Sequence, residues 1–108
     1  VRVVNDQHSS PTYTHDLANY TKELLEKDFS PGVYHATNAG VVTWFDFAKE
    51  IFAAADMQVT VKPVNSAEFR RPAKRPAWSV LLNTKGPKMR SWQEALHDYL
   101  NVYYKKSL

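Results

Sequence analysis

The stretch Gly32–Ala48, GVYHATNAGVVTWFDFA, carries the strongest information about the fold. Its first part, Val33–Ala36, has the composition of a short strand and runs into a Thr-Asn-x-Gly turn. A helix should follow at once, because Thr43 with Asp46 three positions later is a variant of the capping box. A strand that leads through a tight turn into an amphipathic helix predicts the α/β class.

Similar patterns on either side predict two further helices and further short strands. Thr14 is the expected N-cap of a helix that ends at Ser30-Pro31-Gly32, and Ser91 with Glu94 forms a capping box that begins another. The expected buried faces are Leu17, Tyr20, Leu24 and Leu25; Trp44, Phe45, Ala48, Ile51, Phe52 and Ala55; and Trp92, Ala95, Leu96, Tyr99, Leu100 and Tyr103. Strands are expected over Arg2–Asn5, over Val59–Val64, where Pro63 favours an edge, and over Ser79–Leu82. We therefore expect three helices on a small sheet whose first strand is partly unpaired.

Length and composition limit the class of protein. The 108 residues suit one domain over 1–108, and 44% hydrophobic with 23% charged residues is typical of a globular chain. No apolar run approaches the roughly 18 residues that cross a bilayer, and no cysteine is present for a disulfide or a thiolate site. These features predict a cytoplasmic protein without a membrane partner. Because Val1 begins the chain within a strand-like VRVV run, we also expect these residues to be part of a longer protein.

Positive charge is concentrated between residues 62 and 90. That segment has eight basic residues and one acidic residue, a local net charge of +7, whereas the remainder has six basic and ten acidic residues, a net charge of −4. Such a segment favours an anionic partner, either a phosphate or nucleotide or a nucleic acid. A solvated surface loop would give the same pattern.

Sequence patterns for catalysis are missing. Gly32, Gly40 and Gly86 are too far apart for a dinucleotide-binding loop, and no tyrosine is followed four positions later by lysine. The four histidines have no metal-binding spacing, and there is no Gly-x-Ser-x-Gly nucleophile motif. We therefore expect no catalytic residue, no bound cofactor and no metal site within this chain.

Residues suited to holding a ligand occur in two loops. Ser10, Pro11 and Thr12 lie between a strand and a helix, where hydroxyl groups can contact a sugar or a phosphate. Arg71 and Arg75 each precede a proline, and a guanidinium group binds phosphate in a bidentate manner. Asn38 with Gly40 is compatible either with a wall of a cleft or with a simple turn.

Four segments, in this order, resemble one family: DQHSSPTYTHDLA (Asp6–Ala18), YHATNAGVVTWFDFAKEI (Tyr34–Ile51), KPVNSAEF (Lys62–Phe69) and KRPAWSVL (Lys74–Leu81). The family is that of the dTDP-4-dehydrorhamnose reductases, which are extended short-chain dehydrogenases/reductases. The resemblance implies the C-terminal substrate-binding domain of a Rossmann-type reductase that uses NADPH or NADH to make dTDP-L-rhamnose from dTDP-6-deoxy-L-lyxo-4-hexulose. By the same resemblance, an N-terminal Rossmann domain holds the cofactor and the catalytic Tyr-x-x-x-Lys pair.

The resemblance also implies site residues. The Ser10-Pro11-Thr12 loop and Arg75 would face the cleft between the two domains, with Arg75 near the pyrophosphate. The chain departs from the family at Ser9, where glycine is usual, and at Trp78, where asparagine is frequent.

Two alternatives stay open. One is a free-standing basic module that binds nucleic acid or another polyanion, although residues 62–90 contain only two aromatic residues for base stacking. Another is a regulatory relative of the reductases without catalysis. A homodimer is a further open question.

Overall fold

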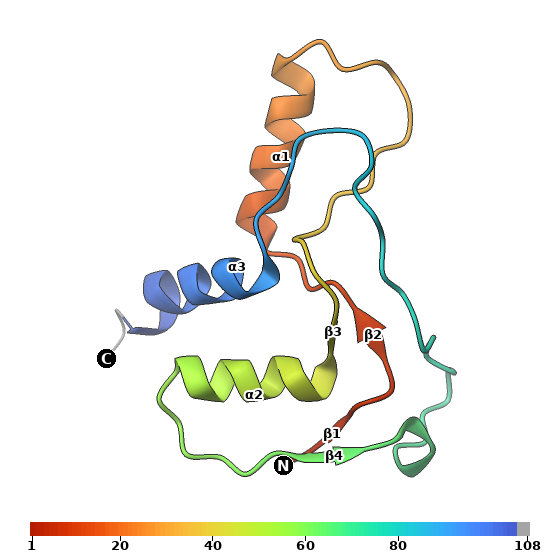
Figure 1. The fold of residues 1–108 in the computed structure, drawn as a ribbon, viewed down its shortest axis with the longest axis vertical. Helices are drawn as coiled ribbons and strands as arrows, with labels where there is room; N and C mark the ends of the chain where they lie inside the picture. The colour runs from red at the N-terminus through yellow and green to blue at the C-terminus, as the bar shows by residue number, and fades with distance from the viewer. Residues whose placement is uncertain (106–108) are drawn as a thin grey trace.

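Three helices and four short strands are present in residues 1–105, the part of the chain that the computed structural model describes (Figure 1). The strands are β1 (Arg2–Val4), β2 (His8–Ser9), β3 (Val42–Thr43) and β4 (Lys62–Val64). The helices are α1 (Thr14–Glu26), α2 (Trp44–Ala54) and α3 (Trp92–Tyr99), which continues as the π-helical segment η2 (Leu100–Tyr104); a 3₁₀ turn, η1, covers Ser66–Glu68. The predicted α/β class with three helices is confirmed.

The strands form two separate two-stranded sheets. β1 and β4 are parallel, with Val3 opposite Pro63, and β2 and β3 are antiparallel, with His8 opposite Thr43. Among the described residues β4 has β1 as its single neighbour, so Pro63 lies in an edge strand as expected, and β1 likewise keeps one unpaired side.

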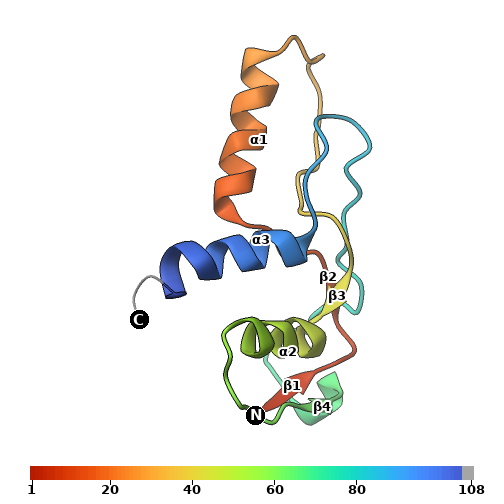
Figure 2. The same ribbon diagram turned by 60° about the vertical axis from the view of Figure 1, so that its left-hand side comes forward.

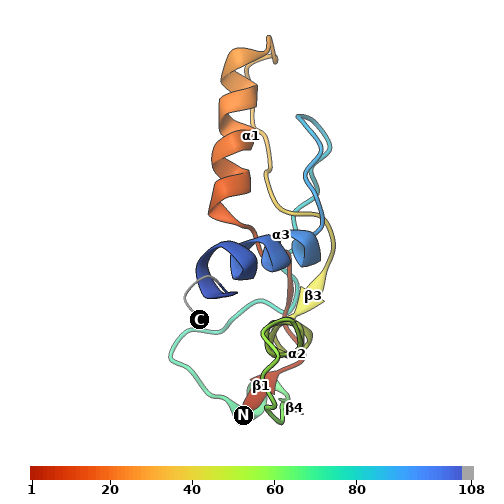
Figure 3. The ribbon, with the colours of Figure 1, turned by 90° about the vertical axis from the view of Figure 1, so that its left-hand side faces the viewer.

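The helices are arranged around this small framework with α3 in the middle. In Figures 1 and 2, α2 lies on one side of α3, next to β1 and β4, while α1 extends away on the other side. The segment between β4 and α3 runs along the edge of the molecule and reaches the level of α1 before it returns (Figure 1). Figure 3 shows the thin dimension, 21 Å against 47 and 38 Å for the other two.

The hydrophobic core is small and lies between α2 and α3. It consists of Val42, Trp92, Leu96 and Leu100, against which Phe47, Ile51, Ala54 and Tyr104 pack. Gly40 approaches this core closely: its φ is +101°, and a Cβ atom there would lie 3.0 Å from the Trp92 ring. The Asn-x-Gly turn is therefore needed both for its backbone angle and for the space it leaves.

The molecule exposes more surface than a chain of this size usually does. Its radius of gyration is 16.1 Å, against about 13 Å for a typical domain of this length. Its accessible surface is 7884 Å², whereas the usual scaling with mass gives about 6,100 Å². A large surface is thus available for contact with another domain or molecule.

Several predicted elements differ from the structure. Val33–Ala36 and Ser79–Leu82 are not strands, and the predicted strand over Val59–Val64 is limited to its last three residues. The N-cap of α1 is Tyr13, not Thr14, and it has no side-chain cap. The predicted faces were partly wrong, because Leu17, Leu25, Trp44, Tyr99 and Tyr103 are exposed. The capping box of Ser91 with Glu94 is confirmed, as is the Thr43 cap of α2.

Candidate functional site

The loop Ser10–Thr12 connects β2 to α1, and its two hydroxyl groups are already engaged. Ser10 Oγ donates a hydrogen bond to the Gly40 carbonyl at 2.7 Å, and Thr12 Oγ1 donates to the Ser10 carbonyl at 3.2 Å. Each hydroxyl has one proton to donate but retains lone pairs that can accept. These side chains are thus prepared to accept hydrogen bonds from ligand hydroxyl groups.

The same loop borders two hollows in the surface. One is an apolar hollow of about 400 Å³, lined by Pro11, Thr12 and residues of α2 and α3. The other is smaller, about 280 Å³, and is lined by Ser10, Thr37 and Lys88 among others. Asn38 is among the residues that line both hollows.

The two arginines lie elsewhere. Arg71 and Arg75 line a third hollow of about 490 Å³, together with Arg2, Trp44 and Phe69. Arg2 lies 5.3 Å above the Phe69 ring and pairs with Glu68 at 3.7 Å. Within residues 1–105, Arg71 and Arg75 have no ion-pair partner, so their guanidinium groups are available to an anion. The structure therefore brings the two arginines together but places them in a different hollow from Ser10, Pro11 and Thr12.

Trp78 holds the arginine-bearing segment against β2. Its ring lies 5.3 Å from the His8 ring, and the His8 amide donates to the Ala77 carbonyl at 2.8 Å. The Ser79 amide donates back to the His8 carbonyl at 2.9 Å. Trp78 thus makes a ring contact with His8 three residues after Arg75. We call the hollow that Arg71 and Arg75 line the arginine hollow.

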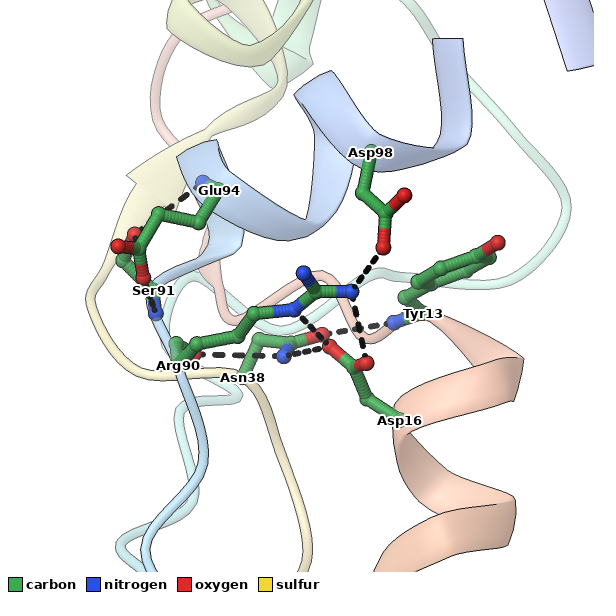
Figure 4. Close-up of polar contacts among 7 residues, drawn as sticks. All are labelled: Tyr13, Asp16, Asn38, Arg90, Ser91, Glu94 and Asp98. Carbon is green, nitrogen blue, oxygen red and sulfur yellow. Dashed lines mark hydrogen bonds and ion pairs between the residues drawn. The ribbon is translucent and has the colours of Figure 1, made fainter. Parts of the chain in front are cut away.

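A partly buried polar network connects the start of α1, the turn that contains Asn38 and the start of α3 (Figure 4). Arg90 binds the carboxylate of Asp16 through two hydrogen bonds of 2.9 Å and reaches Asp98 at 2.6 Å. Asn38 donates to Asp16 at 2.7 Å and is fully buried, with 0% of its surface exposed. Asn38 was singled out from the sequence, but Asp16, Arg90 and Asp98 were not. The capping box at Ser91 locates Arg90 at the start of α3, but no sequence pattern pairs Arg90 with Asp16.

The network shifts the ionisation of its members. Burial alone would raise the pKa of Asp16, but hydrogen bonds from Arg90 and Asn38 outweigh it and leave the pKa below its ordinary value of 3.8. The hydrogen bonds that Arg90 donates to Asp16 and Asp98 raise the pKa of Arg90 further above its ordinary value. Both groups are therefore charged throughout the physiological range.

This pKa shift predicts a loss of stability in acid. Because the pKa of Asp16 is lower in the folded state than in the unfolded state, its contribution is fully present above about pH 5 and is lost as the pH falls through the folded value. The urea midpoint of the wild type should fall steeply below about pH 4. The variant Asp16→Asn lacks this titration and should give a shallower fall, although Asp6, whose pKa is lowered by hydrogen bonds from Ser66, still contributes. Equally steep profiles would contradict the assignment.

Two searches of the described residues were negative. No cluster of three or more histidine, aspartate or glutamate side chains is arranged to hold a metal ion within 1–105. None of the helices in that range is long and apolar enough to span a bilayer.

Comparison with known proteins gives consistent similarities. The profile of the family described as RmlD substrate binding domain matches residues 1–105. The spore coat polysaccharide biosynthesis protein SpsK of Bacillus subtilis is 38% identical over 93% of this chain and 36% of its own length. A dTDP-4-dehydrorhamnose reductase of Mycolicibacterium smegmatis is 40% identical over 91% of this chain and 32% of its own length.

Solved structures show the same likeness. The crystal structure of dTDP-4-dehydrorhamnose reductase from Bacillus anthracis in complex with NADP superimposes with a TM-score of 0.88 at 37% identity. The superposition covers 94% of this chain and 38% of that one. The chain thus spans about a third of the length of the proteins that it matches.

Proposed function

Because the chain belongs to the family of RmlD substrate binding domains, we propose that residues 1–108 form the substrate-binding domain of a dTDP-4-dehydrorhamnose reductase. The whole protein would reduce the 4-keto group of dTDP-6-deoxy-L-lyxo-4-hexulose to give dTDP-L-rhamnose. The observation that carries this proposal is the match of the family profile to residues 1–105. A relative described as a dTDP-4-dehydrorhamnose reductase, 40% identical to this chain, supports it. The comparisons give no support to the alternative of a nucleic-acid-binding module.

The arginine hollow supports a nucleotide ligand. Guanidinium groups bind phosphate oxygens in a bidentate manner, and aromatic rings offer a surface for a base or a sugar face. Arg71 and Arg75 have no competing ion pair within the described residues, and Trp44 with Phe69 supplies two rings in the same hollow. We assign the diphosphate to these arginines.

The sugar is assigned to the loop Ser10–Thr12. Ser10 and Thr12 can accept hydrogen bonds from sugar hydroxyl groups, because their own protons are bound to backbone carbonyls. A nucleotide sugar contains a diphosphate and a hexose as separate groups. One ligand can therefore contact the arginine hollow with its diphosphate and the Ser10–Thr12 loop with its hexose.

The reduction itself is assigned to the rest of the protein. NADPH or NADH, bound to an N-terminal Rossmann domain, would supply the hydride to the keto carbon. The resemblance places the proton donor, the tyrosine of a Tyr-x-x-x-Lys pair, in that domain as well. The exposed surface of the present chain is available for docking against it. We propose a cytoplasmic location for the protein.

Binding measurements test this proposal. Isothermal titration calorimetry of the 108-residue chain should detect dTDP with a dissociation constant on the order of 1 mM, weakening as salt increases. Thymidine, which lacks the diphosphate, should bind more weakly still. The complete gene product should oxidise NADPH when supplied with the 4-keto sugar nucleotide. Absence of both dTDP binding and NADPH oxidation would overturn the proposal, and tighter binding of oligothymidylate than of dTDP would favour a nucleic-acid module.

A further inference from the structure

Asn38 is the only residue among those described whose side chain is both large and completely enclosed, and every polar atom of its amide has a partner. Its Oδ1 accepts a hydrogen bond from the Tyr13 amide at 2.8 Å. Its Nδ2 donates to Asp16 Oδ2 at 2.7 Å and to the Arg90 carbonyl at 3.3 Å. A buried amide whose partners come from the start of α1 and from the segment just before α3 fixes those two segments relative to its own turn.

The partners of Asn38 are themselves held in place. Arg90 donates two hydrogen bonds to the Asp16 carboxylate (Figure 4). These bonds fix the orientation of Asp16 Oδ2, the acceptor for Asn38 Nδ2. The backbone adds a second connection, because the Ala39 amide donates to the Arg90 carbonyl at 2.8 Å and the Trp92 amide donates to the Ala39 carbonyl at 3.0 Å. The turn that contains Asn38 is therefore anchored to the start of α3.

The loop Ser10–Tyr13 is attached to this turn at both of its ends. Ser10 Oγ binds the Gly40 carbonyl, and the Tyr13 amide binds Asn38. Between the two attachments lie Pro11, whose ring fixes its own φ angle, and Thr12. Tyr13 is the N-cap of α1 and has no side-chain cap of its own, and Asn38 accepts the hydrogen bond from the amide of this N-cap residue.

We propose that Asn38 is a positioning residue for substrate: through the Tyr13 amide it sets the backbone of the Ser10–Thr12 loop that contacts the sugar. The inference rests on the proposed function of that loop. The Asn38 side chain is fully enclosed, so its effect on substrate passes through the loop that it holds. Its effect should consequently appear in the affinity for the sugar nucleotide and not in the affinity for the cofactor.

The test uses the complete gene product and the variants Asn38→Asp and Asp16→Asn. An aspartate at position 38 can still accept from Tyr13 but cannot donate, and it places a second negative charge beside Asp16. We expect Asn38→Asp to raise the KM for the sugar nucleotide about tenfold, the loss of roughly one hydrogen bond to a charged group. Asp16→Asn should raise it less, and the KM for NADPH should stay within about twofold in both variants. The exchange variant N38D/D16N restores one donor and one acceptor between the two positions and should recover part of the loss.

A control separates positioning from simple destabilisation. Tyr20→Phe removes the hydrogen bond that the Tyr20 hydroxyl donates to the His35 carbonyl at 3.1 Å, which involves no member of the Asn38 network, so it should lower the melting temperature without changing either KM. The inference is overturned if Asn38→Asp leaves the KM for the sugar nucleotide unchanged, if both KM values rise together, or if Tyr20→Phe raises the KM for the sugar nucleotide equally. Should Asn38→Asp fail to fold, the KM values of Asp16→Asn decide between the same outcomes. A wild type that reduces no dTDP-sugar overturns the proposed function and this inference with it, whereas an active wild type with unaffected variants overturns this inference alone.

Discussion

Replacing Trp92 by alanine should lower the free energy of unfolding by about 3–5 kcal/mol, the usual cost of removing a large aromatic side chain from a core. Trp92 is 7% exposed, and its ring meets Phe47 edge to face at 5.6 Å. It also packs against the Gly40 turn, so its removal weakens the packing of α3 against both α2 and that turn. A domain has only about 5–15 kcal/mol of stability in total, which makes this loss a large share.

Urea unfolding followed by far-ultraviolet circular dichroism measures this effect, and the chain contains a matched control. Trp78→Ala removes the same side chain from a position that is 62% exposed and whose aromatic contact is the His8 ring. The control should cost about 1 kcal/mol or less, as surface substitutions usually do. Equal losses in the two variants would mean that the core does not lie between α2 and α3.

Local sequence patterns predicted the helices well, because the interactions that begin a helix are made within a few residues. Ser91 and Glu94 form both hydrogen bonds of the capping box, and Thr43 accepts from the Asp46 amide at 3.2 Å. The helix faces were less predictable. Trp44 has the correct spacing for the buried face of α2 but is 48% exposed, because the small core contacts Phe47, Ile51 and Ala54 on that helix.

Strands were predicted poorly because a strand is defined by a partner that is distant in the sequence. Val33–Ala36 has a strand composition but pairs with no strand among residues 1–105, and it is irregular there. His8–Ser9 has a loop composition yet forms β2, since Val42–Thr43 lies beside it. Pairings of two residues such as this one leave no periodic pattern to detect.

The candidate site likewise depends on contacts between residues that are distant in the sequence. Sequence patterns and the family resemblance selected Ser10, Pro11, Thr12, Arg71 and Arg75, and their contact with substrate stays a prediction. The polar network between α1 and α3 was not predictable, because Asp16 and Arg90 are 74 positions apart and each has an ordinary local explanation. Asp16 reads as a favourable charge in the first turn of a helix, and Arg90 as one member of a basic segment.

The shape of the arginine hollow, more than the net charge of residues 62–90, should determine nucleotide binding. Charge alone would attract any anion to any part of the segment, with an effect that salt screens within about 10 Å. Arg71 and Arg75 differ from the other basic residues of the segment in lining one hollow together with two aromatic rings. A diphosphate can meet both guanidinium groups there, which a dispersed surface charge cannot provide.

The double variant Arg71→Ala/Arg75→Ala should therefore weaken dTDP binding to the complete gene product about 100-fold, or about 2.8 kcal/mol. Each hydrogen bond to a charged group contributes about 1.5–3 kcal/mol, and the lower value applies because both arginines are exposed. Calorimetry with dTDP measures the change, and each single variant should lose about tenfold. Melting temperatures should stay close to the wild type, since neither side chain has an ion pair within residues 1–105 to lose.

Lys74→Ala is the matched control, because Lys74 lies between the two arginines in the sequence but does not line the hollow. It removes one positive charge from the same loop and should weaken dTDP binding by less than about twofold at physiological salt, where charges that make no direct contact are largely screened. A loss in Lys74→Ala equal to that in Arg75→Ala would show that the loop acts through its total charge. That result would remove the geometric argument for the hollow, and the assignment of the diphosphate to Arg71 and Arg75 would fail with it.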